Sequence, residues 1–272
     1  MEKYNQAESK LANFYMELVE IEEKVSSMEW DAEITDKIIE LWQQGEPLLN
    51  HLQPKVTEEL FNDVYTVVVR ACLKWQPGLQ NLSEDILSKL KEFDKVSIEA
   101  LYSTIINDVE RDKKEWAKRL SISIEMFNFL ASSTSRILLS GFAAHAVTQL
   151  DMEKWKQGYC PICGGNPAMA KLSKEVGVRK LHCNGCETEW RFKRIGCPIC
   201  NNDDSSKISF IMPEDQKQYR LYLCQQCKSY LKTVDERQCG EVDLFCEDLA
   251  TADFDRLANS EGYRRGNQRY RA

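Results

Sequence analysis

Four pairs of cysteines, each with two residues between its members, restrict this chain more than any other feature of its sequence. They are Cys160 with Cys163, Cys183 with Cys186, Cys197 with Cys200, and Cys224 with Cys227. Two intervening residues let both sulfurs of a pair face one metal ion, and two pairs complete a tetrahedral shell. Nineteen residues separate the first two pairs and twenty-three the last two, close to the usual spacing of four-cysteine metal sites.

A repeat within the cysteine region predicts how the pairs combine. The tetrapeptide Cys-Pro-Ile-Cys occurs at 160–163 and again at 197–200, so the unit of knuckle, loop, strand, knuckle and strand is present twice. This assigns one site to Cys160, Cys163, Cys183 and Cys186, and the other to Cys197, Cys200, Cys224 and Cys227. Pairing across the two repeats remains an alternative.

The chemistry of such sites favours a structural role. Four thiolates suit zinc or a single rubredoxin-type iron, and the spacing does not choose between them. A closed shell leaves no position for water or substrate, which argues against metal-assisted hydrolysis. A dithiol redox motif would need its first cysteine at a helix N-terminus, whereas Gly164, Gly165 and Pro167 indicate a knuckle turn. Each ribbon of about thirty residues is too small for a core of its own.

The other cysteines and the start of the chain bear on its location. Cys72 falls on the apolar face of a predicted helix and is expected in the core, whereas Cys239 and Cys246 are interpreted as spare, partly buried thiols. The first residues show no basic segment followed by an apolar one. Eleven cysteines without an export signal predict a cytoplasmic protein. The serine-rich stretch 128–150 is too polar for a membrane span.

The spacing of apolar residues divides the chain. Helical periodicity dominates to about residue 156, with Ser83 expected as the N-cap of one helix. This part shows no catalytic constellation, and His51 and His145 stand alone. We therefore predict an α+β protein: an N-terminal helical bundle (1–156), two tandem four-cysteine ribbons of the rubredoxin or zinc-ribbon type (157–194 and 195–236), and a short C-terminal helix with a basic tail (237–272). The tail is expected to be solvated and frayed, and an interaction segment is the alternative.

Nucleic-acid binding is the alternative function. Arg179, Lys180, Arg191, Lys193 and Arg194 flank Trp190 and Phe192, a pattern that could grip phosphates and stack bases. Residues 160–235 hold twelve Lys and Arg against eight Asp and Glu, but eight thiolates with two divalent cations would cancel this excess. A neutral module gains little from counterion release, which argues against nucleic acid as the partner.

Several segments resemble one known family, the formate dehydrogenase accessory proteins called FdhE. They are the CPxCGxxP motif at 160–167, the LHCNxCETEW motif at 181–190, Tyr-Leu-Lys at 230–232, Asp-Leu-Ala at 248–250 and Glu-Gly-Tyr at 261–263. Lys228 departs from the pattern, because glycine is expected after the fourth pair. An apolar residue also precedes Cys224 where an acidic one is common.

The resemblance implies a cytoplasmic, non-enzymatic assembly factor. Such a protein would bind the catalytic subunit of a molybdenum- or tungsten-dependent formate dehydrogenase and help to bring it to an active state. The eight paired cysteines carry over as ligands of iron or zinc. Trp190, Phe192 and Tyr230 are candidate contacts with the client, unless they pack inside the ribbons. Self-association is left open.

Overall fold

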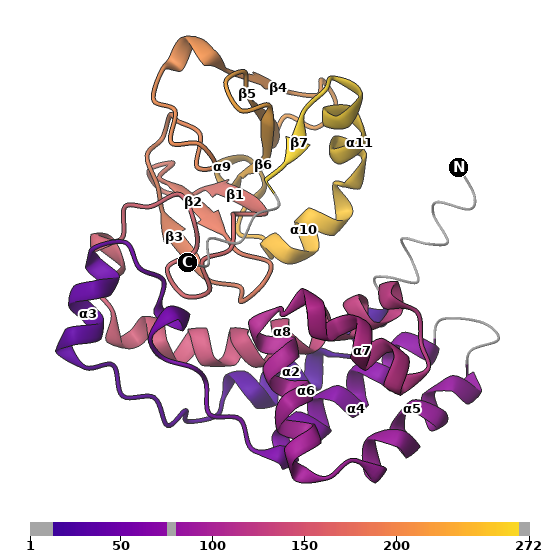
Figure 1. Cartoon of the computed structure of the whole chain (residues 1–272). Helices are drawn as coiled ribbons and strands as arrows, with labels where there is room; N and C mark the ends of the chain where they lie inside the picture. The colour runs from indigo at the N-terminus through magenta and orange to yellow at the C-terminus, as the bar shows by residue number, and fades with distance from the viewer. Residues whose placement is uncertain (1–12, 75–79, 267–272) are drawn as a thin grey trace. The chain divides into compact units, whose positions relative to one another are not determined.

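The structure is a computed structural model that describes residues 13–74 and 80–266 (Figure 1). The chain forms two compact units, one from residues 1–31 and 54–145 and the other from residues 32–53 and 146–272. A helical region is followed by a sheet-containing region with two groups of four cysteines, which confirms the predicted fold class. The four-part division at residues 156, 194 and 236 stays a prediction.

Helices make up the described part of the first unit. They are α2 (Val19–Ser26), α4 (Glu58–Lys74), α5 (Gln80–Glu92), α6 (Lys95–Asn107), α7 (Glu110–Leu120) and α8 (Ile124–Ala146), the last ending at the boundary of the unit. In α4 the apolar residues at helical spacing are buried, including Leu60, Val64 and Val68. Cys72 lies among them with 3% of its surface exposed, which confirms its place in the core.

The helix starts of this unit follow the capping pattern of the sequence only in part. Asp94 caps α6 by accepting a 2.9 Å hydrogen bond from the backbone N–H of Ser97. Ser83 is not an N-cap, because α5 begins at Gln80 and Ser83 therefore lies within its first turn. The small residues of α8 allow close packing: a Cβ on Gly141 would lie 2.6 Å from Val25 Cγ1. No helix in the described residues is long and apolar enough to cross a membrane.

One mixed sheet runs through the second unit and joins both predicted ribbons. The first ribbon contributes β1 (Met169–Leu172), β2 (Arg179–His182) and β3 (Glu189–Arg191), and the second contributes β4 (Ile208–Ile211), β5 (Tyr219–Cys224) and β6 (Ser229–Asp235). The strand order is β3-β2-β1-β6-β5-β4. Neighbours within this order are antiparallel except β1 and β6, which pair in parallel from Met169↔Lys232 to Leu172↔Asp235.

Short helices and one further strand complete this unit. They are α3 (Asp36–Gln43), α9 (Glu236–Cys239), α10 (Leu244–Ala250), α11 (Ala252–Ser260) and β7 (Arg264–Arg265), with the 3₁₀ turns η1 (Leu48–Asn50), η2 (Val147–Gln149), η3 (Met152–Lys154) and η4 (Ser205–Lys207). Thus the single C-terminal helix expected from the sequence is a succession of short helices. Phe254 and Ala258 of α11 pack against Leu221 and Leu223 of β5.

The basic tail is not frayed at its start, contrary to expectation. β7 pairs in parallel with β6, and the guanidinium of Arg265 binds the carboxylates of Asp248 and Asp255 at 2.6 and 2.8 Å. Backbone pairing and two ion pairs therefore order Arg264 and Arg265. Residues 267–272, with the last arginines of the tail, lie outside the described residues.

Candidate metal centres

The first group of cysteines is almost completely buried. Cys160, Cys163, Cys183 and Cys186 each expose at most 2% of their surface. The sulfurs of Cys160 and Cys186 lie 3.4 Å apart, as do those of Cys163 and Cys183, and all four lie within 4.8 Å of one another. We name this group cluster 1.

The second group has the same arrangement and is more open. The sulfurs of Cys197 and Cys227 are separated by 3.6 Å and those of Cys200 and Cys224 by 3.7 Å. Cys200 and Cys227 are half-buried, whereas Cys197 and Cys224 are buried. These four residues, cluster 2, also lie within 4.8 Å of one another. In both groups the structure brings together the pairs of one repeat and not pairs from different repeats.

The sulfur separations fit a tetrahedral metal site. A metal–sulfur bond of about 2.3 Å places the sulfurs of a tetrahedron about 3.8 Å apart. The separations in cluster 2 match this value, and those in cluster 1 need an expansion of a few tenths of an ångström. The two groups could therefore hold two metal ions.

Burial also favours a bound cation. It raises the pKa of Cys160 and of Cys186 well above the ordinary range, and it raises the pKa of Cys200 to about 11. Without a cation these three thiols would therefore stay protonated at neutral pH. A metal ion stabilises the thiolate form and offsets the cost of burying charge.

All four knuckles use one backbone conformation. The residue after the second cysteine is Gly164, Glu187, Asn201 or Lys228, and its φ lies between 56° and 72°. In three knuckles its N–H donates to the carbonyl of the first cysteine, for example from Lys228 to Cys224 at 2.9 Å. Glycine adopts this left-handed conformation without strain, which explains why it is expected where Lys228 stands.

A segment remote in sequence supports the first knuckle. The backbone N–H groups of Leu48 and Leu49 donate 2.9 Å hydrogen bonds to the carbonyls of Pro161 and Ile162. The indole N–H of Trp42, in α3, also donates to the Pro161 carbonyl at 3.1 Å. The carbonyl oxygens of Pro161 and Ile162 thus have hydrogen-bond donors, which buried backbone carbonyls require. Sequence periodicity did not indicate this contact, because hydrogen bonds to backbone carbonyls leave no side-chain pattern.

The two ribbons approach each other closely beside the cysteines. A Cβ on Gly158 would lie only 2.0 Å from the carbonyl oxygen of Pro198. Nearby, the buried guanidinium of Arg179 donates a 2.9 Å hydrogen bond to the carbonyl of Gly196. Both contacts link the first ribbon to the residues around Cys197.

The three aromatic residues expected to contact a partner are buried. Trp190, Phe192 and Tyr230 expose 1%, 6% and 5% of their surfaces, so they pack inside the ribbons. The indole N–H of Trp190 donates to the carbonyl of Gln157, and the hydroxyl of Tyr230 donates to Asp255. Their burial also removes the aromatic platform from the nucleic-acid alternative.

A buried network of charged residues was not foreseen from the sequence. Lys232, with 1% of its surface exposed, lies 2.7 Å from a carboxylate oxygen of Asp248 and 2.9 Å from one of Asp255. We name Lys232, Asp248, Asp255 and Arg265 the buried ion network. Lys232 and Asp248 stand in two of the segments that resemble the FdhE family, which was the only available indication of their role.

The remaining cysteines of this unit lie apart from both clusters. Cys239 and Cys246 are exposed, more so than the partial burial predicted for them. The Cys239 thiol contacts the carbonyl of Asp235 at 3.5 Å, and the backbone N–H of Cys246 is bonded to the Asp243 carboxylate that caps α10. Cys239 is thus the last residue of α9, and Cys246 lies in the first turn of α10.

Comparison with known proteins agrees with the cysteine motifs. Residues 159–194 match the family model "FdhE, central domain", and residues 195–270 match "FdhE, C-terminal domain". These matches confirm the resemblance to the FdhE family.

Individual relatives agree over a longer part of the chain. A Protein FdhE homolog of Shewanella baltica is 27% identical over 197 residues, which are 70% of this chain and 64% of the relative. Protein FdhE of Escherichia coli O1:K1 is 25% identical over 87% of this chain and 73% of the relative. The crystal structure of the FdhE protein from Pseudomonas aeruginosa has a TM-score of 0.57, covering 92% of this chain and 84% of that one at 17% identity, which supports the fold. The chain thus spans 64% of the length of the Shewanella relative.

Proposed function

We infer, from the match of residues 159–270 to the models of the FdhE central and C-terminal domains, that this chain is an accessory factor for formate dehydrogenase. It binds the catalytic subunit of a molybdenum- or tungsten-dependent formate dehydrogenase and supports maturation of that subunit to an active state. The factor acts in the cytoplasm and catalyses no reaction itself. The family resemblance carries this proposal, and four thiolates at each site would leave a bound ion no open position for a substrate.

The eight paired cysteines are the proposed metal ligands. Cys160, Cys163, Cys183 and Cys186 would hold one ion, and Cys197, Cys200, Cys224 and Cys227 the other. Each ion, iron or zinc, would fix two knuckles and thereby a ribbon that has too few residues to stay folded alone. The ribbons then serve as a rigid platform for the client subunit.

Exposed apolar residues on the second ribbon are better candidate contacts than the buried aromatics. Phe210 and Met212 expose 53% and 45% of their surfaces. Phe210 belongs to β4, the last strand in the sheet order, which pairs with β5. An edge strand with an exposed aromatic side chain offers both apolar contact and backbone hydrogen bonds to a partner.

An anaerobic affinity purification of the tagged protein from its own cells tests the function. Bound proteins are identified by mass spectrometry for the native chain and for Cys183→Ser. The matched control is Cys246→Ser, which replaces an exposed cysteine outside both clusters. A formate dehydrogenase catalytic subunit should be retained by the native chain and the control and lost with Cys183→Ser.

The outcome can also contradict the proposal. Recovery of nucleic-acid-binding machinery in place of a formate dehydrogenase subunit, or of no specific protein, would leave the fold intact and remove the function. Retention of the client by Cys183→Ser would separate client binding from the metal module. Replacement of Phe210 by Ser then tests the proposed contact surface, because metal content should be unchanged while client recovery falls.

Metal analysis of anaerobically purified protein addresses the identity of the ions. If the sites hold iron, they could respond to the redox state before the client is released, and the protein should show the visible absorption of a four-thiolate iron centre. Zinc at both sites without such absorption would exclude this redox role.

A further inference from the structure

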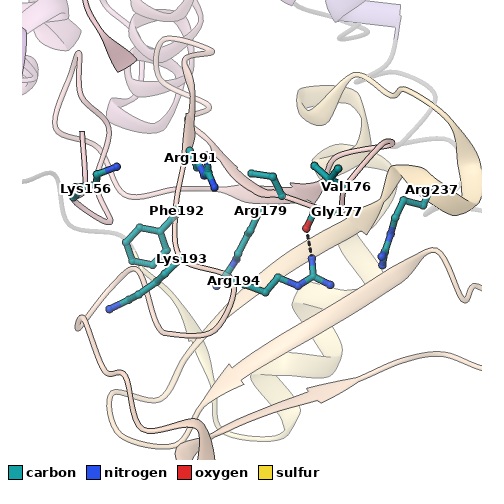
Figure 2. A pocket seen from close by; sticks show the side chains of 10 residues that line it. Lys156, Val176, Gly177, Arg179, Arg191, Phe192, Lys193, Arg194 and Arg237 are labelled. Carbon is teal, nitrogen blue, oxygen red and sulfur yellow. Dashed lines mark hydrogen bonds between the residues drawn. The ribbon is translucent and has the colours of Figure 1, made fainter. Parts of the chain in front are cut away.

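A cleft with basic walls lies in the second unit, outside both cysteine clusters (Figure 2). Its volume is about 770 Å³, and its walls come from the turn between β1 and β2, the segment after β3, Lys156 and Arg237. Six of its ten lining residues are Lys or Arg, and none of the described lining residues is acidic. Clefts of this size commonly accept small ligands.

Arg179 is the most informative residue of the cleft. Its side chain is 3% exposed, and it donates one hydrogen bond, from Nη1 to the carbonyl of Gly196 at 2.9 Å. Its Nε is buried and has no hydrogen-bond partner among the described residues. A buried cation with an unsatisfied donor is costly unless an anion approaches it.

Arg194 adds a second guanidinium without a carboxylate partner. It donates a 2.7 Å hydrogen bond to the carbonyl of Gly177, drawn in Figure 2, and has no ion pair among the described residues. Arg194 is close enough to Arg179 to contribute, after burial, to lowering the pKa of Arg179 to about 10. Two neighbouring guanidinium groups repel each other, and an anion between them would remove that repulsion.

The other cations of the cleft are largely neutralised. Carboxylates pair with three of them: Arg191 with Glu153, Lys193 with Asp203, and Arg237 with Asp235. Among the described residues, the ammonium of Lys156 donates to the backbone carbonyl of Glu153 and has no carboxylate partner. The positive charge left for a ligand is therefore concentrated on Arg179, Arg194 and Lys156.

We propose that this cleft binds the diphosphate group of a phosphorylated small molecule. Guanidinium groups present parallel N–H donors that match two oxygens of one phosphate, and two phosphates can use the two arginines. A diphosphate carries several negative charges near neutral pH, which suits three cations that have no carboxylate partner among the described residues. This site goes beyond the proposed contact with a client subunit.

Nucleic-acid backbones also carry phosphate groups, but the walls of the cleft favour a small molecule over a nucleic acid. Stacking of bases would need an open aromatic face. Phe192 is 6% exposed, and the ammonium of Lys193 lies 5.4 Å from the centre of its ring. A single-stranded nucleic acid would therefore meet positive charge in the cleft but no aromatic surface on which its bases could stack.

Arg179 also has a competing structural role. It is bonded to the residue before Cys197 and could compensate the thiolate charge of cluster 2. Arg179→Gln can therefore disturb the fold. Arg194→Gln is the decisive variant, because Arg194 is exposed at the cleft and its single described hydrogen bond is to a turn carbonyl.

The test measures binding to the full-length, metal-loaded chain by isothermal titration calorimetry at fixed ionic strength. The probes are inorganic diphosphate, ADP and an oligothymidylate. Arg256→Gln is the matched control, since Arg256 lies on α11, away from the cleft, and pairs with Asp253. Circular dichroism and metal content confirm that each variant is folded.

Diphosphate and ADP should bind the native chain and Arg256→Gln equally. Arg194→Gln should weaken both by about tenfold, the usual effect of losing a charge-assisted hydrogen bond. No binding of diphosphate or ADP, or equal binding by both variants, would overturn the proposal. Binding of the oligothymidylate alone, weakened by Arg194→Gln, would also overturn it by assigning the cleft to nucleic-acid phosphates.

Discussion

The side-chain amide of Asn184 donates a 2.7 Å hydrogen bond to the carboxylate of Asp248. Asn184 lies between the two cysteines of a knuckle of cluster 1, and Asp248 lies in α10 and belongs to the buried ion network. A ligand-bearing turn is therefore attached directly to the helices that follow the sheet. Asp248 also accepts two hydrogen bonds from Arg265, so one carboxylate connects the knuckle, α10 and β7.

Asp248→Asn should destabilise the chain by about 3 kcal/mol, because it removes the charge that Lys232 and Arg265 share in a buried site. Urea unfolding followed by circular dichroism measures the change. Asp253→Asn is the control: its ion pair with Arg256 is exposed, so it should change stability by less than about 0.5 kcal/mol. Equal effects would mean that the network contributes no more than a surface ion pair.

Acid should destabilise the native chain more steeply than Asp248→Asn. Burial by itself would raise the pKa of Asp248, but the hydrogen bonds and charges of Arg265 and Lys232 outweigh it and lower that pKa. A carboxyl with a lowered folded-state pKa stabilises the protein above its unfolded-state pKa, and this contribution is lost as the pH falls through the folded-state pKa. Urea midpoints measured from neutral pH downward should converge for the two proteins. Parallel curves would exclude Asp248 as a source of the pH dependence.

Gly158→Ala should cost about 3 kcal/mol, because the added Cβ would meet the carbonyl oxygen of Pro198, a backbone atom that cannot move without shifting the second ribbon. Gly262→Ala is the comparison: its φ is 79° and nothing lies within 4 Å of its Cβ position, so it should cost about 1 kcal/mol from backbone strain alone. Thermal unfolding of both variants ranks the two costs. A smaller loss for Gly158→Ala would show that the ribbons can separate there.

Lys228→Gly should be more stable than Lys228→Ala by about 1 kcal/mol, because φ at this position is 57° and glycine alone adopts it without strain. Both variants lose the contact of the Lys228 ammonium with the Tyr263 ring, so their difference isolates the backbone. Chemical unfolding of the metal-loaded proteins measures it. Equal stabilities would indicate that the knuckle relaxes to another conformation.

A chelator should remove metal from cluster 2 before cluster 1. Cys200 and Cys227 are half-buried, whereas all four cysteines of cluster 1 are buried, so a chelator reaches cluster 2 more easily. Release into a chromogenic chelator should show two phases, and Cys183→Ser should abolish the slow one. Loss of the fast phase with this variant would reverse the assignment, and Cys246→Ser should leave both phases unchanged.

The sequence predicted those features that depend on short-range spacing. Two residues between paired cysteines determine a knuckle, and apolar residues such as Val64 and Val68 determine the buried face of a helix, so both could be read locally. The family resemblance, and not the spacing, led us to expect glycine at position 228, and the φ of 57° at Lys228 explains that expectation.

Features that depend on the tertiary fold could not be predicted in this way. The support of the Pro161 carbonyl by Leu48 uses backbone atoms, which leave no residue pattern. The burial of Lys232 depends on the C-terminal helices, which carry its partners Asp248 and Asp255, and the indole of Trp190 bonds to the Gln157 carbonyl in the segment before the first knuckle. The clefts and their charge follow from the same packing, so Arg179 could be recognised as a basic residue but not as a buried one.

The parallel pairing of β1 with β6 has a consequence for how the two ions bind. A metal ion in cluster 1 should order β1, and one in cluster 2 should order β6. Each ordered strand then offers its backbone for pairing with the strand of the other ribbon. Thermodynamic reciprocity then requires that each ion raise the affinity of the chain for the other by the same factor. We therefore expect metal uptake to be cooperative at equilibrium, so that release of the ion from cluster 2 lowers the affinity of cluster 1 for the ion that remains.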